Sequence, residues 1–348
     1  MKISLIGTID ETHTKVSGQY DRTEIVLNGL VERGYEIVFT NMMDWKKKTF
    51  FILFKIIRNY FKSHVVIIIA SLNGVRMNLK ILNFLRIFSK KPVFQIAVGG
   101  QSNCIFVRNE QKYRNLISNL NGVFVEIPDM VEKYKEVGID KVYHLPNCKT
   151  IDLDSPRIEP MMEKPFKFCT YSRVTPEKGI KEAIDAVEKL NKKYGENYCT
   201  LDIYGTYLPE DELWFRNLMK NASNSITYKA RIERKDSIKT LGKYDLMLFP
   251  TKHVGEGVPG GMIDCYEAGL PIIVCNTSFM STIVLDGKSG FVYEGNNDEN
   301  LTKAIIRYTE ELSLEEKKKM RKICVEIARS YDTSSVIDTL SKYLDSVK

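Results

Sequence analysis

The sequence has few histidines and no pairing pattern among its cysteines. The 348 residues include four histidines and seven cysteines, the latter at positions 104, 148, 169, 199, 265, 275 and 324. An odd number of cysteines without paired spacing argues against a disulfide framework, and the spacing is not that of a zinc site. We therefore expect a reducing compartment and no structural metal site.

Long apolar segments are absent as well. The longest apolar runs, at residues 50–54 and 65–70, are much shorter than the roughly 20 residues of a membrane-spanning helix. The apolar start at Met1 is short and continues directly into a strand pattern, which argues against a signal peptide. Neither an internal repeat nor a low-complexity tract is present. These absences predict a cytoplasmic protein.

Acidic residues are missing from one long stretch. Between Trp45 and Asn109 the sequence has no Asp or Glu but twelve Lys and Arg. The formal net charge of +7 comes from the first part of the chain, because residues 1–150 hold 22 basic and 13 acidic residues, against 29 and 31 in the remainder. Up to Lys62 this stretch mixes aromatic with basic residues, as an interfacial helix does. Because each basic side chain near an anionic leaflet contributes about 1 kcal/mol, we expect peripheral contact of the 45–109 region with an anionic membrane.

The same helix has a second interpretation, in which it packs into a core. Phe51, Phe54, Ile57 and Phe61 would then point inward, with the lysines in solvent. Both interpretations can hold, because one face of a helix can pack while its basic flank meets lipid. Nucleic acid would also suit the charge, but no recognition module is present, so we expect no nucleic-acid partner.

The order of apolar patterns predicts an α/β protein with two domains. Residues Met1–Gly7 have a strand pattern, and a helical pattern at 23–33 leads to a strand at 36–39. A chain of 348 residues is long enough for two domains with separate cores. Prolines and polar residues between Lys149 and Pro165 predict the linker. Within it, Asp152-Leu153-Asp154 has the form of a metal-binding Asp-x-Asp, but we interpret it as a plain turn.

The segment from Glu256 to Pro271 is rich in glycine and carries paired acids. Strand patterns at 244–250 and 270–275 flank it, so a loop and a helix that stops at Gly269 join two strands. Ligands of open α/β sheets bind at the carboxyl ends of strands, where this loop lies. Glycines and a helix start let amides approach a phosphate, or a sugar with developing charge. Glu256 and Asp264, the latter about two turns into the helix, suit hydroxyl groups.

Two basic residues occur in another loop that follows a strand. The segment Phe168–Ile180 has a strand pattern, then a loop with Arg173 and Lys178, and then begins an amphipathic helix. Two fixed cations there can neutralise a diphosphate leaving group without a metal ion. Taken alone, the pair could be a surface feature and the glycine segment an ordinary crossover. A third segment, Thr282–Val292, has a turn between short apolar runs.

Together and in this order, these segments resemble the retaining, family-4-type glycosyltransferases (glycosyl transferases group 1) of the GT-B architecture. The Glu-Gly-x-Pro-Gly variant is similar to transferases of bacterial capsule, exopolysaccharide and O-antigen assembly. The resemblance implies an α/β fold of two Rossmann-like domains with parallel sheets facing a central cleft. Residues 1–150 would form an N-terminal acceptor-binding domain, onto which a C-terminal helix at about 331–348 crosses back. Residues 151–330 would form the C-terminal nucleotide-sugar-binding domain.

The resemblance implies a role for each motif residue. Arg173 and Lys178 match the family's Arg-x-x-x-x-Lys-Gly element, which implies contacts to the donor diphosphate. Glu256 and Asp264 match its paired acids, with seven residues between them, which implies contacts to the donor sugar and the nucleotide ribose. The family usually has Glu at the second position, so Asp264 is a departure, one methylene shorter. Glu267 is then expected on the helix surface.

The first half of the chain matches the family less closely. Residues Thr14–Arg22 occupy the position of the family's glycine loop, so Gly18 and Gln19, with Arg22 as a further candidate, are expected to contact the donor. Many relatives carry a histidine where this chain has Gly99-Gly100-Gln101, and a role of that histidine does not transfer. We interpret His253 as a loop residue that lines the pocket. The predicted catalytic residues are Glu256, Arg173 and Lys178, and the predicted donor-binding residues are Gly18, Gln19, Arg173, Lys178, Glu256, Gly257, Val258, Pro259, Gly260, Gly261 and Asp264.

The implied activity is metal-independent hexosyl transfer. A sugar would move from a nucleotide-diphosphate donor, in our interpretation a UDP-sugar, to a lipid-linked or growing glycan in bacterial surface polysaccharide synthesis. No cofactor is expected, since the nucleotide sugar is a co-substrate. Two alternatives stay open. A nucleotide-sugar 2-epimerase of the same architecture would need acid/base residues in the cleft, and a non-catalytic polybasic membrane adaptor would leave the paired acids unused.

Overall fold

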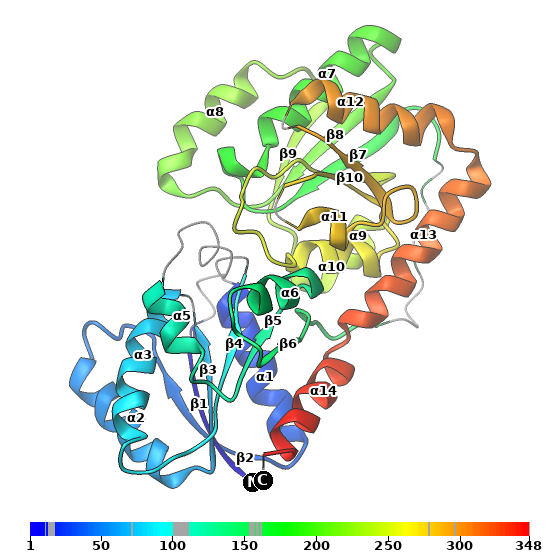
Figure 1. Cartoon of the computed structure of the whole chain (residues 1–348). Helices are drawn as coiled ribbons and strands as arrows, with labels where there is room; N and C mark the ends of the chain where they lie inside the picture. Colours follow the sequence, from blue (N-terminus) through cyan, green and yellow to red (C-terminus); the bar gives the residue numbers. More distant parts are fainter. Residues whose placement is uncertain are drawn as a thin grey trace. The chain divides into compact units, whose positions relative to one another are not determined.

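The computed structural model describes residues 1–10, 12, 18–70, 72–99, 111–152, 157, 160, 162–277, 279–295 and 297–347 (Figure 1). Contacts divide the chain into two compact units. Unit 1 comprises Met1–Thr150, Gly255–Gly260 and Ser330–Lys348, and unit 2 comprises Ile151–Val254 and Gly261–Arg329. Each unit contains one parallel sheet, which confirms the α/β prediction.

Unit 1 is built on a sheet with the order β2-β1-β3-β4-β5-β6, all strands parallel. The strands are β1 (Lys2–Gly7), β2 (Glu36–Asn41), β3 (Val65–Ala70), β4 (Val93–Ala97), β5 (Gly122–Val125) and β6 (Val142–His144). The helices are α1 (Gly18–Glu32), α2 (Thr49–Lys62), α3 (Leu72–Leu85), α5 (Gln111–Ile117), α6 (Pro128–Glu136) and α14 (Thr333–Asp345). Strand order reverses between β1 and β3, which is the switch point where open α/β sheets bind ligands.

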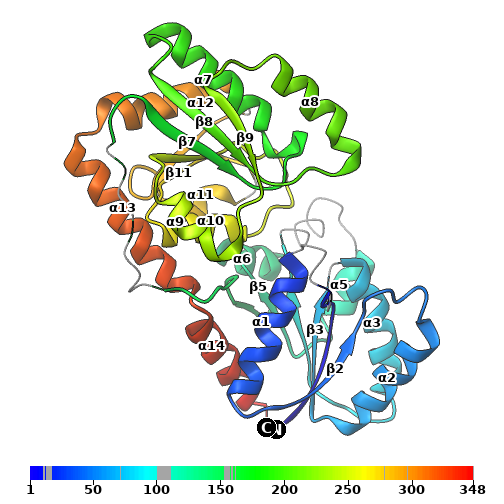
Figure 2. The ribbon, with the colours of Figure 1, turned by 180° about the vertical axis from the view of Figure 1, so that it is seen from behind.

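The end of the chain belongs to unit 1. Helix α14 packs against α1, and both views show the two helices side by side (Figures 1 and 2). The contact is tight, since a Cβ on Gly29 of α1 would lie 2.7 Å from Cγ1 of Ile337. Arg33 donates to Asp338 Oδ1 at 2.6 Å at the end of the same interface. Helices α2 and α3 pack on the other face of the sheet, because the right-handed connections β2-α2-β3 and β3-α3-β4 run in the opposite direction to β1-α1-β2.

Unit 2 is built on a second parallel sheet with the order β12-β11-β10-β7-β8-β9, which is the Rossmann order. The strands are β7 (Phe166–Tyr171), β8 (Cys199–Tyr204), β9 (Ile226–Ala230), β10 (Leu246–Phe249), β11 (Ile272–Cys275) and β12 (Gly290–Tyr293). The helices are α7 (Ile180–Tyr194), α8 (Glu212–Lys220), α9 (Ser237–Leu241), α10 (Gly260–Glu267), α11 (Met280–Ile283), α12 (Asp298–Ile306) and α13 (Leu314–Ala328), with short helices η2 (Pro176–Lys178), η3 (Pro209–Asp211), η4 (Arg234–Asp236), η5 (Arg307–Glu311) and η6 (Arg329–Tyr331).

Two predicted element boundaries were wrong. Helix α1 begins at Gly18 and not at residue 23, so Gly18–Arg22 form its first turns instead of a loop. Helix α2 begins at Thr49, and Lys46–Lys48 lie in the turn before it. The start of α2 is poorly marked in the sequence, because its N-cap residue, Lys48, makes no side-chain cap hydrogen bond.

The core interpretation of α2 was also wrong in its choice of face. The helix buries Ile52, Ile56, Asn59 and Tyr60, while Phe51, Phe54 and Phe61 are 65%, 64% and 50% exposed. Asn59 explains the difference, since its amide donates to the buried Thr40 hydroxyl of β2 at 3.0 Å and turns that face inward. The phenylalanines are left on the surface.

Candidate functional site

The two predicted motif loops of unit 2 follow strands that are neighbours in the sheet. Strand β10 pairs with β7, with Leu246 opposite Phe168 and Met247 opposite Cys169. Chain order reverses between these two strands, so their carboxyl ends flank the switch point of the sheet. The sequence pattern alone contained no information on this pairing. The fold therefore brings the basic loop and the glycine-rich loop to one edge.

The loops are bonded to each other near their bases. Lys252 donates its backbone N–H to the carbonyl of Glu177 at 2.7 Å. Gly179 sits between the loop and α7 with φ +73°, and a Cβ there would lie 2.1 Å from the carbonyl oxygen of Pro250. Only glycine permits this approach. His253, which we interpreted as a pocket-lining residue, places Nδ1 3.1 Å from the Glu177 carboxylate.

The two predicted phosphate-binding cations differ in environment. Arg173 is exposed in the loop after β7. Lys178 is buried at the end of η2, with its ammonium 5.4 Å from the ring centroid of Phe249, the last residue of β10. The aromatic face and the loop around it hold the Lys178 cation at the edge of the sheet. An exposed and a buried cation thus occupy the same loop.

Asp264 lies beside the end of β7. It is the fifth residue of α10, so it lies about one turn into the helix and not two, because the helix already begins at Gly260. Its side chain is buried and accepts a hydrogen bond from the Tyr171 hydroxyl at 3.2 Å. Burial, with a further contribution from the Asp264 charge, raises the pKa of Tyr171, so this phenol stays a donor. A Cβ on Gly261 would lie 2.9 Å from the Tyr171 carbonyl oxygen, which explains the glycine.

Glu267 is not on the helix surface, contrary to the prediction. Its side chain is 5% exposed, and Oε1 accepts the backbone N–H of Asp152 at 2.9 Å. Arg157 donates Nε to the Glu267 backbone carbonyl at 2.7 Å. The chain after unit 1 therefore packs over the end of α10 and covers this carboxylate. Of the predicted turn at Asp152–Asp154, Leu153 and Asp154 lie outside the described residues.

The glycine loop itself makes its contacts within unit 1. Val258 donates its N–H to Glu126 Oε2 at 3.1 Å, and its carbonyl accepts from Asn147 Nδ2 at 2.9 Å. A Cβ on Gly257 would lie 2.3 Å from Glu126 Oε2. Glu256, next to this pair, is partly buried. The carboxylate of Glu126 therefore determines how this loop is held.

Glu126 is a residue that the sequence patterns did not single out. It directly follows β5, is buried, and also accepts the N–H of Gly99 at 3.3 Å through Oε1. Burial raises the pKa of the Glu126 carboxyl, and the charge of Arg22 opposes this shift. An acid that ends an otherwise apolar strand, Val123–Val125, is the signal that could have revealed it.

The predicted contacts from the first domain are only partly described. Gln19 donates Nε2 to the Thr8 hydroxyl at 3.3 Å, and a Cβ on Gly18 would have open space around it. Arg22 was a further candidate, but its guanidinium is buried and donates to the Leu145 carbonyl at 3.3 Å and to Cys148 Sγ at 3.0 Å. It is therefore a core residue of unit 1. The preceding Thr14–Ser17 lie outside the described residues.

The described residues include neither a metal-binding cluster nor a helix that could span a membrane. No group of three or more His, Cys, Asp or Glu residues among them could hold a metal ion. No helix in the described ranges has the length and apolar character needed to cross a membrane.

A family model with the description "Glycosyl transferases group 1" matches residues 154–330, just over half of the chain. The chain belongs to this family. The matched segment contains the loops after β7 and β10 and the whole of α10. The family assignment therefore covers the residues that carried the resemblance.

Known proteins agree with this membership. The chain is 27% identical over 214 residues to the GtfA subunit of a UDP-N-acetylglucosamine–peptide N-acetylglucosaminyltransferase of Streptococcus pneumoniae, a match that covers 59% of this chain and 41% of the relative. It is 22% identical over 210 residues to an uncharacterized glycosyltransferase of Methanocaldococcus jannaschii, covering 60% and 49%. The chain thus spans less than half the length of the curated relatives it matches.

The fold of this group 1 family member also has solved counterparts. The structure of Anabaena HepE in complex with UDP aligns with a TM-score of 0.76 at 14% identity, and the alignment covers 99% of this chain and 100% of HepE. HepE has also been solved with UDP-glucose, and that structure aligns with a TM-score of 0.72. The two parallel six-stranded sheets of this chain are those of the GT-B fold, as the sequence resemblance implied.

Proposed function

We propose that the chain is a retaining, metal-independent hexosyltransferase that transfers a sugar from a UDP-sugar to a lipid-linked or growing glycan in bacterial surface polysaccharide synthesis. One observation carries the proposal. The loop with Arg173 and Lys178 and the glycine-rich loop follow β7 and β10, the strands that flank the switch point of the second sheet. The UDP complexes of HepE and the UDP-N-acetylglucosamine named for the pneumococcal relative support the choice of UDP.

The donor diphosphate would bind at this edge of the sheet. Arg173 and Lys178 supply two positive charges to the departing diphosphate, so no metal ion is required. Helix α10 begins at Gly260, and the free amides of its first turn add partial positive charge. Because Lys178 is buried, its ammonium lies in a low-dielectric environment, where it would interact more strongly with the diphosphate.

The two acids would bind hydroxyl groups of the donor. Glu256 accepts from the hydroxyls of the donor sugar while the anomeric carbon gains oxocarbenium character. Asp264 accepts from the ribose, and the hydrogen bond from Tyr171 fixes the shorter side chain in place. Retention follows if the acceptor attacks from the side of the leaving group. The bond from the acceptor oxygen to the anomeric carbon then forms as the bond to the diphosphate breaks, and the acceptor proton passes to a diphosphate oxygen.

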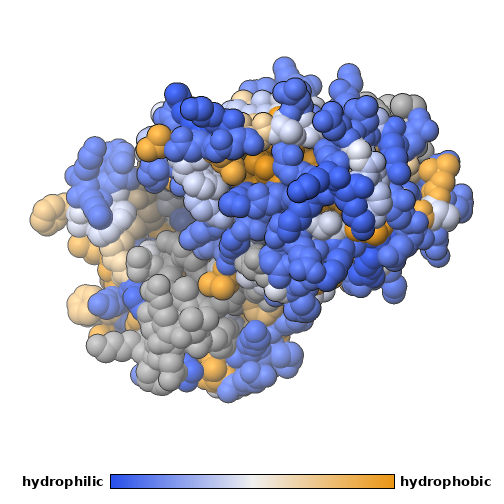
Figure 3. All heavy atoms as spheres, turned by 90° about the horizontal axis from the view of Figure 1, so that it is seen from above, coloured by the Kyte–Doolittle hydropathy of each residue, from blue (hydrophilic) through white to orange (hydrophobic). Residues whose placement is uncertain are grey.

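Unit 1 carries a surface that suits the expected membrane partner. Of the fifteen large hydrophobic side chains that are exposed among the described residues, eight lie between Trp45 and Phe88. Apart from Trp45, these side chains form what we call the aromatic surface, with exposures from 50% to 89%: Phe50, Phe51, Phe54, Phe61, Phe84, Ile87 and Phe88. The face drawn in Figure 3, by contrast, is mainly hydrophilic. Basic residues and no acids surround the surface in the sequence, which favours an anionic bilayer at the cytoplasmic side over a protein partner.

The decisive experiment combines the purified protein with labelled nucleotide sugars and crude membrane lipids. Transfer of label into the lipid fraction, with the anomeric configuration of the donor kept in the product by NMR, is the expected result. Isomerised donor without transfer would instead support the epimerase. If neither reaction occurs and liposome binding is intact, only the membrane adaptor remains.

The phosphate assignment is tested by UDP binding in isothermal titration. We expect Arg173→Ala and Lys178→Ala each to weaken UDP binding about tenfold or more, because a charge-assisted hydrogen bond contributes about 1.5–3 kcal/mol. Lys181→Ala is the matched control, since Lys181 lies three residues further, on α7, and pairs with Asp185. If both variants bind UDP as the parent does, the assignment is wrong.

A further inference from the structure

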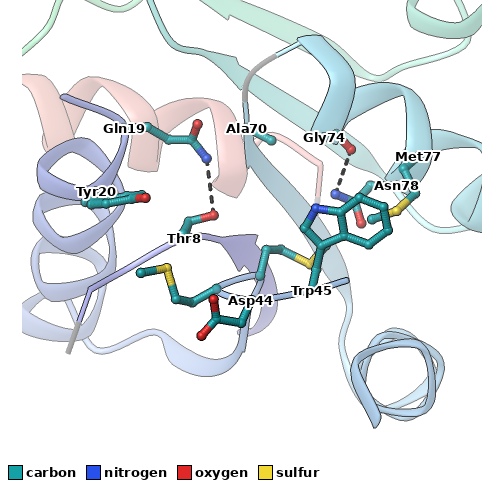
Figure 4. Close-up of a pocket in the computed structure, with 11 residues that line it drawn as sticks. Thr8, Gln19, Tyr20, Asp44, Trp45, Ala70, Gly74, Met77 and Asn78 are labelled. Atoms are coloured by element: carbon teal, nitrogen blue, oxygen red, sulfur yellow. Dashed lines mark hydrogen bonds between the residues drawn. The ribbon is translucent and has the colours of Figure 1, made fainter. Parts of the chain in front are cut away.

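A pocket of about 380 Å³ opens at the carboxyl ends of β1, β2 and β3 in unit 1 (Figure 4). This position is the switch point of the first sheet, between β1 and β3. The volume lies within the range of small-molecule sites, which is roughly 300–1,000 Å³. The described residues that line it are Thr8, Gln19, Tyr20, Met42, Met43, Asp44, Trp45, Ala70, Gly74, Met77 and Asn78.

Local structure holds the walls of the pocket in place. Asn41, at the end of β2, donates Nδ2 to the Ile9 carbonyl at 3.0 Å and accepts from Met43 N–H at 3.0 Å, which joins the exits of β1 and β2. Asp44 has φ +54°, a left-handed conformation that aspartate tolerates better than most residues. The turn it makes directs Trp45 back along the pocket, and the backbone N–H of Trp45 donates to the Met42 carbonyl at 3.2 Å.

The pocket has two chemically different sides. Figure 4 shows the indole of Trp45 on the same side as Gly74, Met77 and Asn78, with Thr8, Gln19 and Tyr20 opposite. One side thus offers the indole ring of Trp45, a residue that is 40% exposed, and the other offers hydroxyl and amide groups. A flat aromatic ring binds the C–H face of a pyranose, while hydroxyls and amides bind its edges.

Charge restricts the ligand further. The described lining residues include one carboxylate, Asp44, and no Lys, Arg or His. Among these described residues, a phosphate or diphosphate would find no cation and would be repelled by the Asp44 carboxylate, whereas a neutral sugar would donate its hydroxyls to it. The pocket therefore favours a neutral polyhydroxylated ligand over a nucleotide.

Asn78 supplies an independent observation. Its side chain is fully buried, and Nδ2 donates to the Gly74 carbonyl at 2.9 Å, while Oδ1 is a buried acceptor without a hydrogen-bond partner among the described residues. A buried acceptor without a partner costs about 1–3 kcal/mol, so it is retained only where something compensates for it. A ligand hydroxyl that reaches this oxygen after a small shift of the pocket wall would satisfy it.

We infer that this pocket binds one neutral sugar residue of the acceptor glycan, with the sugar's C–H face on Trp45 and its hydroxyls on Asp44 and Asn78. The assignment of the sugar to the acceptor rests on the proposed transferase function. The binding of a neutral sugar in this pocket does not. Only Lys46–Lys48 separate Trp45 from α2, so a glycan in the pocket would lie next to the aromatic surface that we propose for lipid contact.

Tryptophan fluorescence tests the pocket directly. The chain has two tryptophans, Trp45 and Trp214, so a Trp214→Phe protein reports on Trp45 alone. Methyl glycosides of glucose, galactose, mannose and N-acetylglucosamine are titrated into it, with UDP as the counter-probe, and binding is checked by saturation-transfer NMR. We expect at least one glycoside to change the emission saturably and UDP to leave it unchanged.

Two variants locate the binding. In the parent background, Trp45→Ala should abolish the saturation transfer, and Asp44→Asn, which tolerates the same left-handed turn, should weaken binding about tenfold. Trp214→Phe should leave saturation transfer as in the parent. Thermal unfolding of each variant shows that the protein is folded. In the transfer assay, Trp45→Ala should raise the KM of the acceptor and leave the KM of the donor unchanged.

The outcomes separate this inference from the proposed function. Glycoside binding that depends on Trp45, in a protein without transfer activity, supports the sugar site and contradicts the transferase. The inference is overturned if no glycoside binds, if binding persists in Trp45→Ala, or if UDP and not a sugar saturates the Trp45 signal.

Discussion

Asp245, just before β10, is a single buried residue whose ionisation affects the stability of the protein. Its Oδ2 accepts the backbone N–H of Lys167 at 2.7 Å, and burial raises its pKa from 3.8 to about 6. Arg321 and Lys317 are buried nearby and oppose this shift with their charge. Since the folded state binds the proton more tightly than the unfolded chain, the associated stability is present below about pH 4 and is lost as pH rises through about 6.

Substitution of this residue should therefore change how stability depends on pH. Asp245→Asn cannot titrate, so its free energy of unfolding relative to the parent should rise by about 2 kcal/mol between pH 4 and pH 7. Urea unfolding of both proteins at the two pH values measures this difference. The exposed Asp140→Asn is the control and should show no such change. A difference for Asp245→Asn that is the same at both pH values would contradict the raised pKa.

The sequence indicated which residues of the motif loops carry charge or bind hydroxyl groups, because these loops need particular chemistry. Arg173 and Lys178 lie in the loop that follows β7, where their pattern placed them. Their partners were not predictable. The acceptor for the Tyr171 hydroxyl is 93 positions away along the chain, and the carboxylate that covers the Asp152 amide is 115 positions away. Spacing along a sequence carries no information at such distances.

Helix α7 likewise combines a pattern that the sequence reveals with contacts that it does not reveal. Its start and its end both have a glycine with positive φ, Gly179 at +73° and Gly195 at +107°. The periodicity that predicts the helix does not distinguish these glycines. In the structure, a Cβ at Gly179 would meet the Pro250 carbonyl, while a Cβ at Gly195 would meet nothing within 4 Å.

Mutation of the two glycines separates backbone strain, which both positions have, from the close approach to Pro250, which only Gly179 has. Gly195→Ala should cost about 1–3 kcal/mol through backbone strain alone, since φ 107° and ψ 152° lie close to a region that only glycine adopts readily. Gly179→Ala should cost more than that and should also weaken UDP binding, because the loops after β7 and β10 must move apart. Denaturant unfolding and isothermal titration with UDP measure the two effects. Equal losses of stability, with unchanged UDP binding in both variants, would show that the close approach at Pro250 does not matter.

At the scale of the whole molecule, charge and exposed aromatics coincide in the first 150 residues. The net charge of +7 arises there, and most of the exposed aromatic side chains lie on α2 and at the end of α3. Charge alone would attract many partners. The exposed phenylalanines add apolar area that a bilayer can cover, and this combination is typical of peripheral membrane proteins.

Membrane attachment can be measured by sedimentation with liposomes. Replacing Lys46, Lys47 and Lys48 by glutamine should lower binding to anionic vesicles by roughly two orders of magnitude, since each cation contributes about 1 kcal/mol. Phe50→Ser with Phe54→Ser should lower binding further, even at a salt concentration that screens the charges. The control is Leu213→Ser, which removes an exposed leucine of unit 2 that is 72% exposed. Unchanged sedimentation of the lysine variant would remove the membrane proposal.

The sequence by itself determined the alternation of strands and helices, the fold class and the residue types of the two motif loops. These properties depend on local periodicity and on short spacings, which a linear sequence records directly. Tertiary structure alone decided that β7 and β10 are neighbours, that Phe51 and Phe54 face outward, and that Glu267 and Glu126 are buried. It also decided that the ends of three strands enclose a pocket beside Trp45. The reason is that strand order and burial follow from contacts between residues far apart in the chain, which only packing brings together.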